Sequence, residues 1–192
     1  MLFRSQGFDS AGLVGADPIE EQRRASLAAL SVREAFEPMA PLVLPADTPA
    51  TEALAQLIAA HGHALLVLED EQVIGLVSLQ DLQRGLTAAA GKLEDLSLGD
   101  CRRGDLLWLP ANARLDRLED QLLPGGLRQI PVFAVEEGAG SYLPSGLPSA
   151  GLPVSSLQGL ASRDGLARAL ARQLQQRPLE KSATKASATG SD

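Results

Sequence analysis

The sequence contains one pattern twice. Residues 43–67 (VLPADTPATEALAQLIAAHGHALLV) align with residues 108–132 (WLPANARLDRLEDQLLPGGLRQIPV) at a constant offset of 65 positions. Apolar residues match along both copies, so that Leu57, for example, falls on Leu122. Their spacing predicts a strand, a helix and a second strand in each copy. Such a repeat predicts an α/β fold of two βαββα lobes, related by a pseudo-twofold axis, with a ligand cleft between the lobes.

Each copy continues into a Gly-apolar-apolar-Ser motif, GLVS at 75–78 and GLAS at 159–162. These motifs are 84 positions apart, so the second copy contains about 19 additional residues. The extra residues fall at about 136–156, in a stretch rich in Gly, Pro and Ser. This composition predicts a mobile loop or a hairpin extension.

Changes in composition divide the chain into four parts. Asp17 and Pro18 form a helix start, with Asp as the N-cap and Pro at the first helical position. The end of the chain is poor in apolar residues, which is typical of disorder. The predicted parts are an N-terminal linker (1–30) with a short helix at 18–30, a first repeat (31–90), a second repeat (91–176) and a disordered tail (177–192).

The composition argues against several classes of protein. The net charge is −7 and no basic stripe is present, so we expect no nucleic-acid partner. Cys101 is the single cysteine, which excludes an intramolecular disulfide, and two histidines are too few to build a metal site with it. No long apolar run is present, so we expect a cytoplasmic chain that does not itself enter a membrane. No catalytic set follows from residue spacing, so we do not expect an enzyme.

The doubled order of elements resembles a tandem pair of CBS domains, also called a Bateman module. The resemblance covers about residues 31–176. It is carried by PADTPATEALAQLIAA, by HALLVLEDEQVIGLVSLQDLQRGL and by LRQIPVFAV of the second copy. Each motif is weak alone, but their order, found twice, is specific. The family implies a homodimer, with the helices predicted at 50–60, 79–86, 113–123 and 164–176 as the candidate contacts.

A shorter resemblance lies upstream, in LFRSQGFDS and in DPIEEQRRASLAALSVREAFEPM. This segment is similar to the linker that joins the last membrane helix of a bacterial ClC-type chloride channel or transporter to its CBS pair. The resemblance implies a covalently attached membrane channel domain and a position at the cytosolic face of a membrane.

The first copy fully meets the family pattern for binding an adenine nucleotide. Gly75 allows close backbone approach, Ser78 begins a helix whose N-terminus favours a phosphate, and the Asp81 carboxylate suits two ribose hydroxyls. Alternatively, Ser78 is a simple helix cap and Asp81 a solvated acid. The family takes the adenine-facing wall from the other copy, which adds Trp108, Leu109, Gln129 and Ile130. Trp108, the only Trp, is also consistent with a place in the core.

The second copy departs from this pattern. Gly165 stands at the Asp position, and Asp164 lies one residue early. One residue rotates a helical side chain by about 100°, so this site is lost, altered or shifted in register. Arg163 either pairs with a phosphate or lies on the surface. The possible second site comprises Val43, His61, His63, Ala64, Ser162 and Asp164. An alternative for the two histidines is a helix C-terminal end, where a positive charge is favoured.

Two functions follow from the resemblance. One is a regulatory module that binds ATP, ADP or AMP in the cleft between the repeats and modulates an attached ClC-type channel or transporter, with no cofactor required. The other is a ligand-free structural module for dimerisation, or a stand-alone regulator of another protein.

Overall fold

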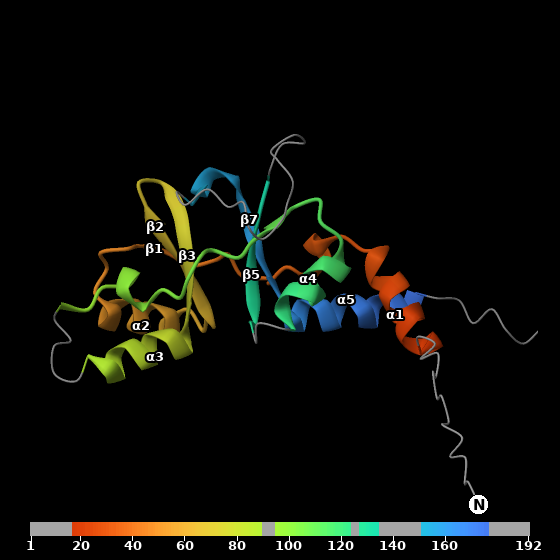
Figure 1. Ribbon diagram of the computed structural model, residues 1–192, viewed down its shortest axis with the longest axis horizontal. Helices are drawn as coiled ribbons and strands as arrows, with labels where there is room; N and C mark the ends of the chain where they lie inside the picture. Colours follow the sequence, from red (N-terminus) through yellow and green to blue (C-terminus); the bar gives the residue numbers. More distant parts are fainter. Residues whose placement is uncertain (1–16, 90–94, 124–126, 135–150, 177–192) are drawn as a thin grey trace, which may run out of the picture.

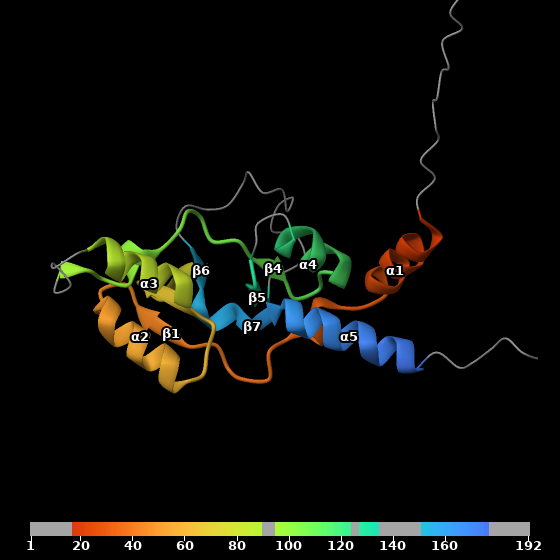
Figure 2. The ribbon, with the colours of Figure 1, turned by 90° about the horizontal axis from the view of Figure 1, so that it is seen from below.

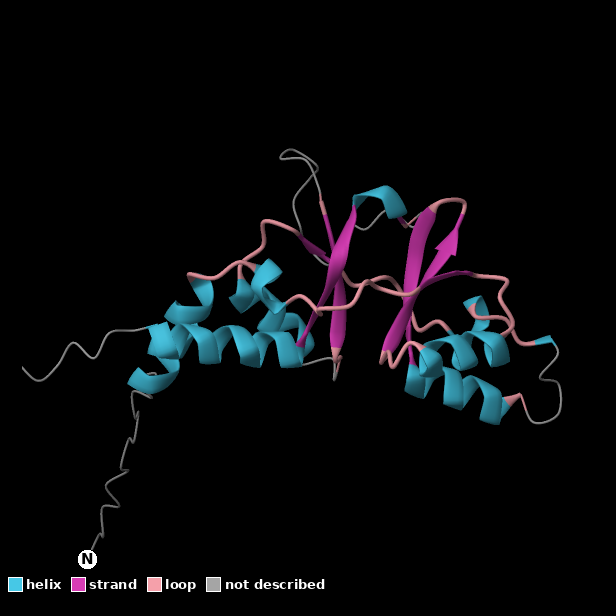
Figure 3. Ribbon diagram, turned by 180° about the vertical axis from the view of Figure 1, so that it is seen from behind, coloured by secondary structure: helices cyan, strands magenta, loops and turns pink. Residues whose placement is uncertain are grey.

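The computed structural model describes residues 17–89, 95–123, 127–134 and 151–176. Two sheets lie side by side at the centre, and the helices lie toward the outer ends (Figures 1 and 3). The predicted α/β fold of two lobes is thereby confirmed. The predicted disordered tail and most of the predicted insertion lie outside the described residues. None of the helices in the described ranges combines the length and apolar character that a bilayer crossing requires.

The first lobe follows the predicted order of elements. Strand β1 runs parallel to β2, and β2 runs antiparallel to β3. Helices α2 and α3 cover one face of this sheet (Figure 1). The elements are β1 (Val43–Pro45), α2 (Ala50–Ala59), β2 (Ala64–Glu69), β3 (Gln72–Ser78) and α3 (Leu79–Ala88).

The second lobe has the same topology, because β4 runs parallel to β5 and β5 antiparallel to β7. Its strands and helix α4 are shorter than their counterparts in the first lobe, and α5 is longer. The elements are β4 (Leu109–Pro110), α4 (Leu115–Leu122), β5 (Gln129–Phe133), the short helix η4 (Val154–Ser156), β7 (Leu157–Ser162) and α5 (Arg163–Gln176).

The end of the predicted insertion connects the lobes. Strand β6 (Leu152–Pro153) pairs antiparallel with β3 and is the fourth strand of the first sheet. Gly151 before it has a φ of +80°, and a Cβ there would lie 2.7 Å from the Val73 carbonyl oxygen. Only glycine therefore fits this approach to the sheet.

Two short segments cross from one lobe to the other, and we call residues 31–37 and 97–103 the crossing segments. The first contains η1 (Val32–Ala35) and precedes β1, yet it forms bridges to Arg114 and Ala161 of the second lobe. The other contains η3 (Gly99–Cys101) and precedes β4, yet it packs on the first lobe, where the Leu98 N–H donates to the Thr48 carbonyl at 2.8 Å. Each lobe is thus completed by the segment that leads into the other.

The core is aliphatic, as the low aromatic content predicts. One buried cluster lies within each lobe. A third joins the two sheets through Leu66 and Val73 from the first lobe, and Phe133 and Leu160 from the second. Burying side chains of this size stabilises the folded state by about 2 kcal/mol each, so this cluster fixes the lobes to one another.

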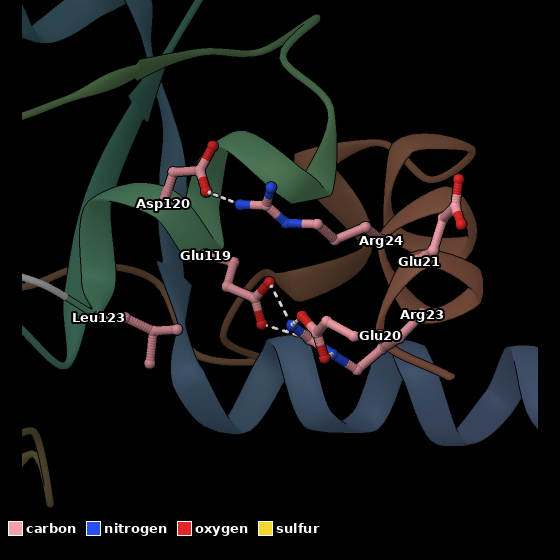
Figure 4. A pocket seen from close by; sticks show the side chains of 7 residues that line it. All are labelled: Glu20, Glu21, Arg23, Arg24, Glu119, Asp120 and Leu123. Atoms are coloured by element: carbon pink, nitrogen blue, oxygen red, sulfur yellow. Dashed lines mark hydrogen bonds and ion pairs between the residues drawn. The ribbon is translucent and has the colours of Figure 1, made fainter. Parts of the chain in front are cut away.

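Helix α1 (Pro18–Ala28) packs on α4 and α5 of the second lobe (Figure 2). It starts at the predicted residue, where the Asp17 carboxylate accepts from the Ile19 N–H at 3.0 Å, and it ends two residues before the predicted Leu30. The Arg23 guanidinium pairs with the buried Glu119 carboxylate, and Arg24 pairs with Asp120 at 2.9 Å (Figure 4). A pocket lined mainly by charged side chains lies between α1 and α4. Its arginines and acids pair with one another, so these charges hold α1 on the second lobe.

Candidate functional site

A cavity of about 330 Å³ lies where the two lobes meet. It is bordered by the junction of β3 with α3, by the chain leading to β4 and by β5. Its lining combines apolar side chains with a cluster of charges around Asp81. The apolar members are Ala64, Leu76, Leu79, Leu106, Leu107, Leu127 and Pro131, and the polar ones are His63, Ser78, Gln80, Asp81, Arg84, Arg103, Asp105, Arg128 and Gln129.

The Asp81 carboxylate is fixed in this cavity by hydrogen bonds to Ser78. Its Oδ2 accepts from the Ser78 N–H at 3.0 Å and from the Ser78 hydroxyl, while its own N–H donates to Ser78 Oγ at 3.2 Å. Burial by itself would raise the pKa of Asp81, but the Ser78 hydrogen bonds and then Arg84 outweigh burial and hold the pKa below its usual value. The carboxylate is therefore ionised at neutral pH, at the first turn of α3.

Three arginines line the same cavity. Arg84 donates to Asp81 Oδ1 at 3.0 Å, and Arg103 Nε lies 3.5 Å from the same oxygen. The third, Arg128, is exposed. The N–H groups of Leu79 and Asp81 are already bonded, to the His63 carbonyl and to Ser78 Oγ. An anion here would therefore depend on the guanidinium groups more than on the helix N-terminus that the motif predicts.

The structure places only part of the predicted site in the cavity. Ser78, Asp81 and Gln129 line it. Ile130 and Leu109 instead lie in the core of the second lobe. Strand alternation explains the difference for Ile130, because neighbours along β5 point to opposite faces of the sheet.

Gly75 and Trp108 are not among the residues that line this cavity. A Cβ on Gly75 would lie 2.2 Å from Arg102 Cδ, so the glycine accommodates this arginine, which donates to the Ile74 carbonyl at 2.6 Å. Trp108 packs edge-on against Phe133 with ring centroids 6.1 Å apart. Its place is therefore at the core between the lobes, one of the two alternatives stated for it.

A second cavity of about 440 Å³ adjoins the first at the start of α5. His63, Ser162 and Asp164 of the predicted second site line it, and Ala64 lines the first cavity instead. Val43 packs against the core between the lobes. His61 follows α2 in a left-handed conformation, with φ of 50°, at the helix C-terminal end that was its alternative. The complete lining is Glu37, His63, Gln80, Arg128, Gln129, Ser162, Arg163 and Asp164.

Gly165 explains why the second copy lacks the acid of the pattern. A Cβ at this position would lie 1.9 Å from the Ala35 carbonyl oxygen of the first crossing segment. No side chain fits there, so an acidic residue is excluded from the position equivalent to Asp81. Ser162 retains a capping role, since its Oγ accepts from the Gly165 N–H at 2.9 Å. Arg163 donates to the Leu122 carbonyl at 2.7 Å, which ties α5 to α4.

Residue spacing missed the charged residues of the crossing segments. Arg103 lines the first cavity and Glu37 the second. Arg103 directly follows Arg102, which packs against Gly75 of the first lobe. Glu37 directly follows Phe36, which packs against Gly159 of the second lobe. Aligning SVREAFE (31–37) with SLGDCRR (97–103) would have identified them as equivalent positions.

Metal binding and thiol chemistry have little support in the described part of the chain. No group of three metal-binding side chains is found among those residues. Burial first, and then the charges of Asp100 and Asp81, raise the pKa of the Cys101 thiol. A thiol held neutral in this way is a poor nucleophile.

One family model matches part of the chain. Residues 32–88 match the family model of the CBS domain. No curated protein matches the chain. Attachment to a ClC-type membrane protein stays a prediction.

Solved structures of CBS-domain proteins share the fold. The structure of CBSX2 in complex with AMP is 22% identical, with a TM-score of 0.55, and the match covers 76% of this chain and 98% of that one. The CBS domain of the bacterial CNNM/CorC family Mg²⁺ transporter is 14% identical, with a TM-score of 0.55 and coverage of 80% and 84%. A CBS-domain containing protein from Agrobacterium tumefaciens is 19% identical, with a TM-score of 0.53 and coverage of 71% and 87%. At these identities the likeness shows the fold alone.

Proposed function

We propose that this chain is a regulatory CBS-pair module that binds an adenine nucleotide in the cavity between its lobes. The observation that carries the proposal is the ionised Asp81 carboxylate, held by Ser78 in a partly apolar cavity that three arginines line. A carboxylate accepts hydrogen bonds from a ribose diol, guanidinium groups bind phosphates, and apolar side chains cover a base.

Binding requires a rearrangement of the arginines. Arg84 and Arg103 now pair with Asp81, but their side chains are 50% and 68% exposed. Exposed ion pairs contribute about 0–1 kcal/mol, so transferring these guanidinium groups from a carboxylate to a phosphate has a small cost. The Ser78 hydrogen bonds meanwhile keep Asp81 in place. The AMP complex of CBSX2, a protein of the same fold, supports an adenine nucleotide as the ligand.

Thermal melting with ATP, ADP and AMP at millimolar concentration tests the proposal. A ligand at 100 times its dissociation constant adds about 2.7 kcal/mol to the free energy of unfolding. We expect Asp81→Asn to abolish the nucleotide-induced shift in Tm, and the control Asp164→Asn in the second lobe to retain it. Absence of a shift with every nucleotide would rule out the sensor function.

Regulation would act through the arrangement of the lobes. A nucleotide in the cavity contacts both lobes, so it favours the arrangement that it fits best. We infer a covalently attached membrane domain of the ClC type as the regulated partner, on the basis of the similarity of the segment before residue 40. The upstream reading frame tests this directly. Several apolar segments of about 20 residues would support it, and a stop codon directly upstream would contradict it.

Dimerisation is the second candidate function, and the exposed face of α2 favours it. Ile58 is 58% exposed there, next to the half-buried Leu54. A second copy of the chain would bury these side chains. Sedimentation at micromolar concentration tests this candidate, and a monomer at every concentration would argue against it.

A further inference from the structure

Arg103 lies beside the Asp81 carboxylate without a hydrogen bond to it. Its Nε is 3.5 Å from Asp81 Oδ1, and its side chain is 68% exposed. Arg84, in contrast, donates a hydrogen bond to the same oxygen at 3.0 Å. The Arg103 guanidinium can therefore turn toward a ligand at Asp81 without breaking a hydrogen bond to that carboxylate.

The preceding residues fix the backbone from which Arg103 extends. The Arg102 guanidinium donates to the Ile74 carbonyl at 2.6 Å, and its side chain packs where Gly75 leaves room. Cys101 is 6% exposed and belongs to the core of the first lobe. The second crossing segment is thus anchored next to the cavity, and only the side chain of Arg103 has to move to meet a ligand.

The N-terminus of α3 has few N–H groups left for a phosphate. The N–H groups of Ser78, Leu79 and Asp81 donate to the Asp81 carboxylate, the His63 carbonyl and Ser78 Oγ. A guanidinium group is always charged and presents several donors in one plane, which match phosphate oxygens. An arginine beside Asp81 is therefore better suited to a phosphate than the helix terminus is.

The equivalent position in the first crossing segment has the opposite charge. Glu37 lines the second cavity, as Arg103 lines the first. Asp164 adds another carboxylate there. Like charges repel, so a phosphate is favoured beside Arg103 and disfavoured beside Glu37.

We propose that Arg103 binds the phosphate of the nucleotide whose ribose Asp81 holds, so that the cavity selects nucleotides over nucleosides. This inference rests on the proposed nucleotide binding. Arg102 acts as a positioning residue, because it holds the segment that carries Arg103. The phosphate ligand is thus supplied by the segment between the repeats and not by the repeat motif.

Calorimetric titration of the full chain with AMP and with adenosine tests the role of Arg103, because these probes differ only by the phosphate. We expect the wild type to bind AMP about tenfold or more tightly than adenosine. Arg103→Gln should weaken AMP binding about tenfold and change adenosine binding by no more than about twofold. Arg103→Lys keeps the charge but loses the planar fork, so it should weaken AMP binding selectively but less. The control Arg117→Gln removes the same charge from an exposed position of α4 outside both cavities, and should leave both affinities unchanged.

Arg102→Ala tests the positioning role. It should weaken AMP binding about threefold and leave adenosine binding unchanged, and it should cause no further loss in the Arg103→Gln background. The same loss in both backgrounds would show that Arg102 acts independently of Arg103.

The remaining outcomes separate this role from nucleotide binding itself. Equal wild-type affinities for the two probes, no loss in Arg103→Gln, or an equal loss for both probes would each overturn the role of Arg103 and leave binding in the cavity intact. Binding of neither probe would also overturn it, and melting with ATP, ADP and AMP would then decide the nucleotide proposal separately. Melting curves verify that each variant folds, and the selectivity of Arg103→Lys decides the matter if Arg103→Gln does not fold.

Discussion

The two lobes share a backbone plan but differ in charge where they meet. The first lobe places Asp81 at the start of α3, and the second places Gly165 at the equivalent point of α5. The crossing segment on the first lobe brings Arg103, and the one on the second brings Glu37. The same topology therefore gives a cavity lined by Asp81 and three arginines on one side and an occluded motif on the other.

The outer faces of the lobes also differ in charge. Helix α4 presents the acids Glu119 and Asp120, which pair with arginines of α1. The equivalent residues of α2 are Leu54 and Ala55. The arginines of α1 thus pair with acids of the second lobe, while Ile58 on the apolar face of α2 is 58% exposed among the described residues. Divergence has changed the surfaces of the repeats and kept their cores.

The largest expected effect is on the free energy of unfolding, and it comes from replacing a glycine of each lobe, Gly165 or Gly75, by alanine. Alanine normally stabilises a helix by about 1 kcal/mol over glycine, but Gly165→Ala should lower the free energy of unfolding by about 3 kcal/mol or more. Its Cβ would collide with the Ala35 backbone carbonyl. Gly75→Ala meets the exposed Arg102 side chain instead, which can move, so we expect a loss of about 1 kcal/mol. Chemical denaturation measures both, and equal losses would contradict the proposed occlusion of the second motif.

Two neighbouring arginines of α1 test how this helix is held on the second lobe. Arg23→Ala leaves Glu119, whose side chain is 8% exposed, without its partner, and we expect a loss of about 2 kcal/mol. Arg24→Ala leaves Asp120, whose side chain is 48% exposed, and should cost at most about 0.5 kcal/mol. Thermal melts of the two variants provide the comparison. A larger loss for Arg24→Ala would show that burial of Glu119 does not hold α1.

Equivalent apolar residues test the open face of the first lobe. Ile58 and Leu123 are both 58% exposed and lie at equivalent positions of the repeats. If α2 binds a second copy, Ile58→Glu should weaken self-association by about tenfold, since it places a charge in the contact. Leu123→Glu, beside α1, should have little effect. Sedimentation velocity over a concentration series measures both, and the reverse order would place the contact on the second lobe.

The smallest expected effect is the pH dependence of the helix caps. The lowered pKa of Asp81 means that its stabilising contribution is complete above the ordinary carboxyl pKa and is lost as the pH falls through the lowered value. Asp81→Asn should therefore cost about 1 kcal/mol at pH 7 and almost nothing at the lowest pH at which the chain stays folded. Ser162→Ala, at the cap of the second lobe, should cost a similar amount at every pH. Urea titrations at several pH values give these differences, and a constant cost for Asp81→Asn would refute the assigned cause.

Local patterns were sufficient to predict much of the fold and the centre of the candidate site. The repeat and its apolar spacing predict the order of elements, because each strand and helix of the lobes must bury one face. The Gly-apolar-apolar-Ser motif locates Ser78 and Asp81 because their contacts are three residues apart. The assignment of Leu109 and Ile130 to the cavity failed because a strand register decides which residues face the core.

The arginines at the cavity illustrate what local patterns miss. Arg103 reaches Asp81 only because its segment crosses to the other lobe, and no short-range spacing reports such a crossing. The same holds for the exclusion of a side chain at Gly165, which depends on a carbonyl 130 positions earlier in the chain.

The crossing segments also bear on the origin of the tandem arrangement. A polypeptide with one repeat would have a leading segment but no second lobe to receive it, so two such chains could complete each other only by exchanging those segments. In the tandem chain, covalent linkage supplies each segment to the other lobe at an effective concentration in the millimolar range. Once joined, the halves no longer had to be identical. One could lose its acid and the other keep it without a mismatched partner ever forming.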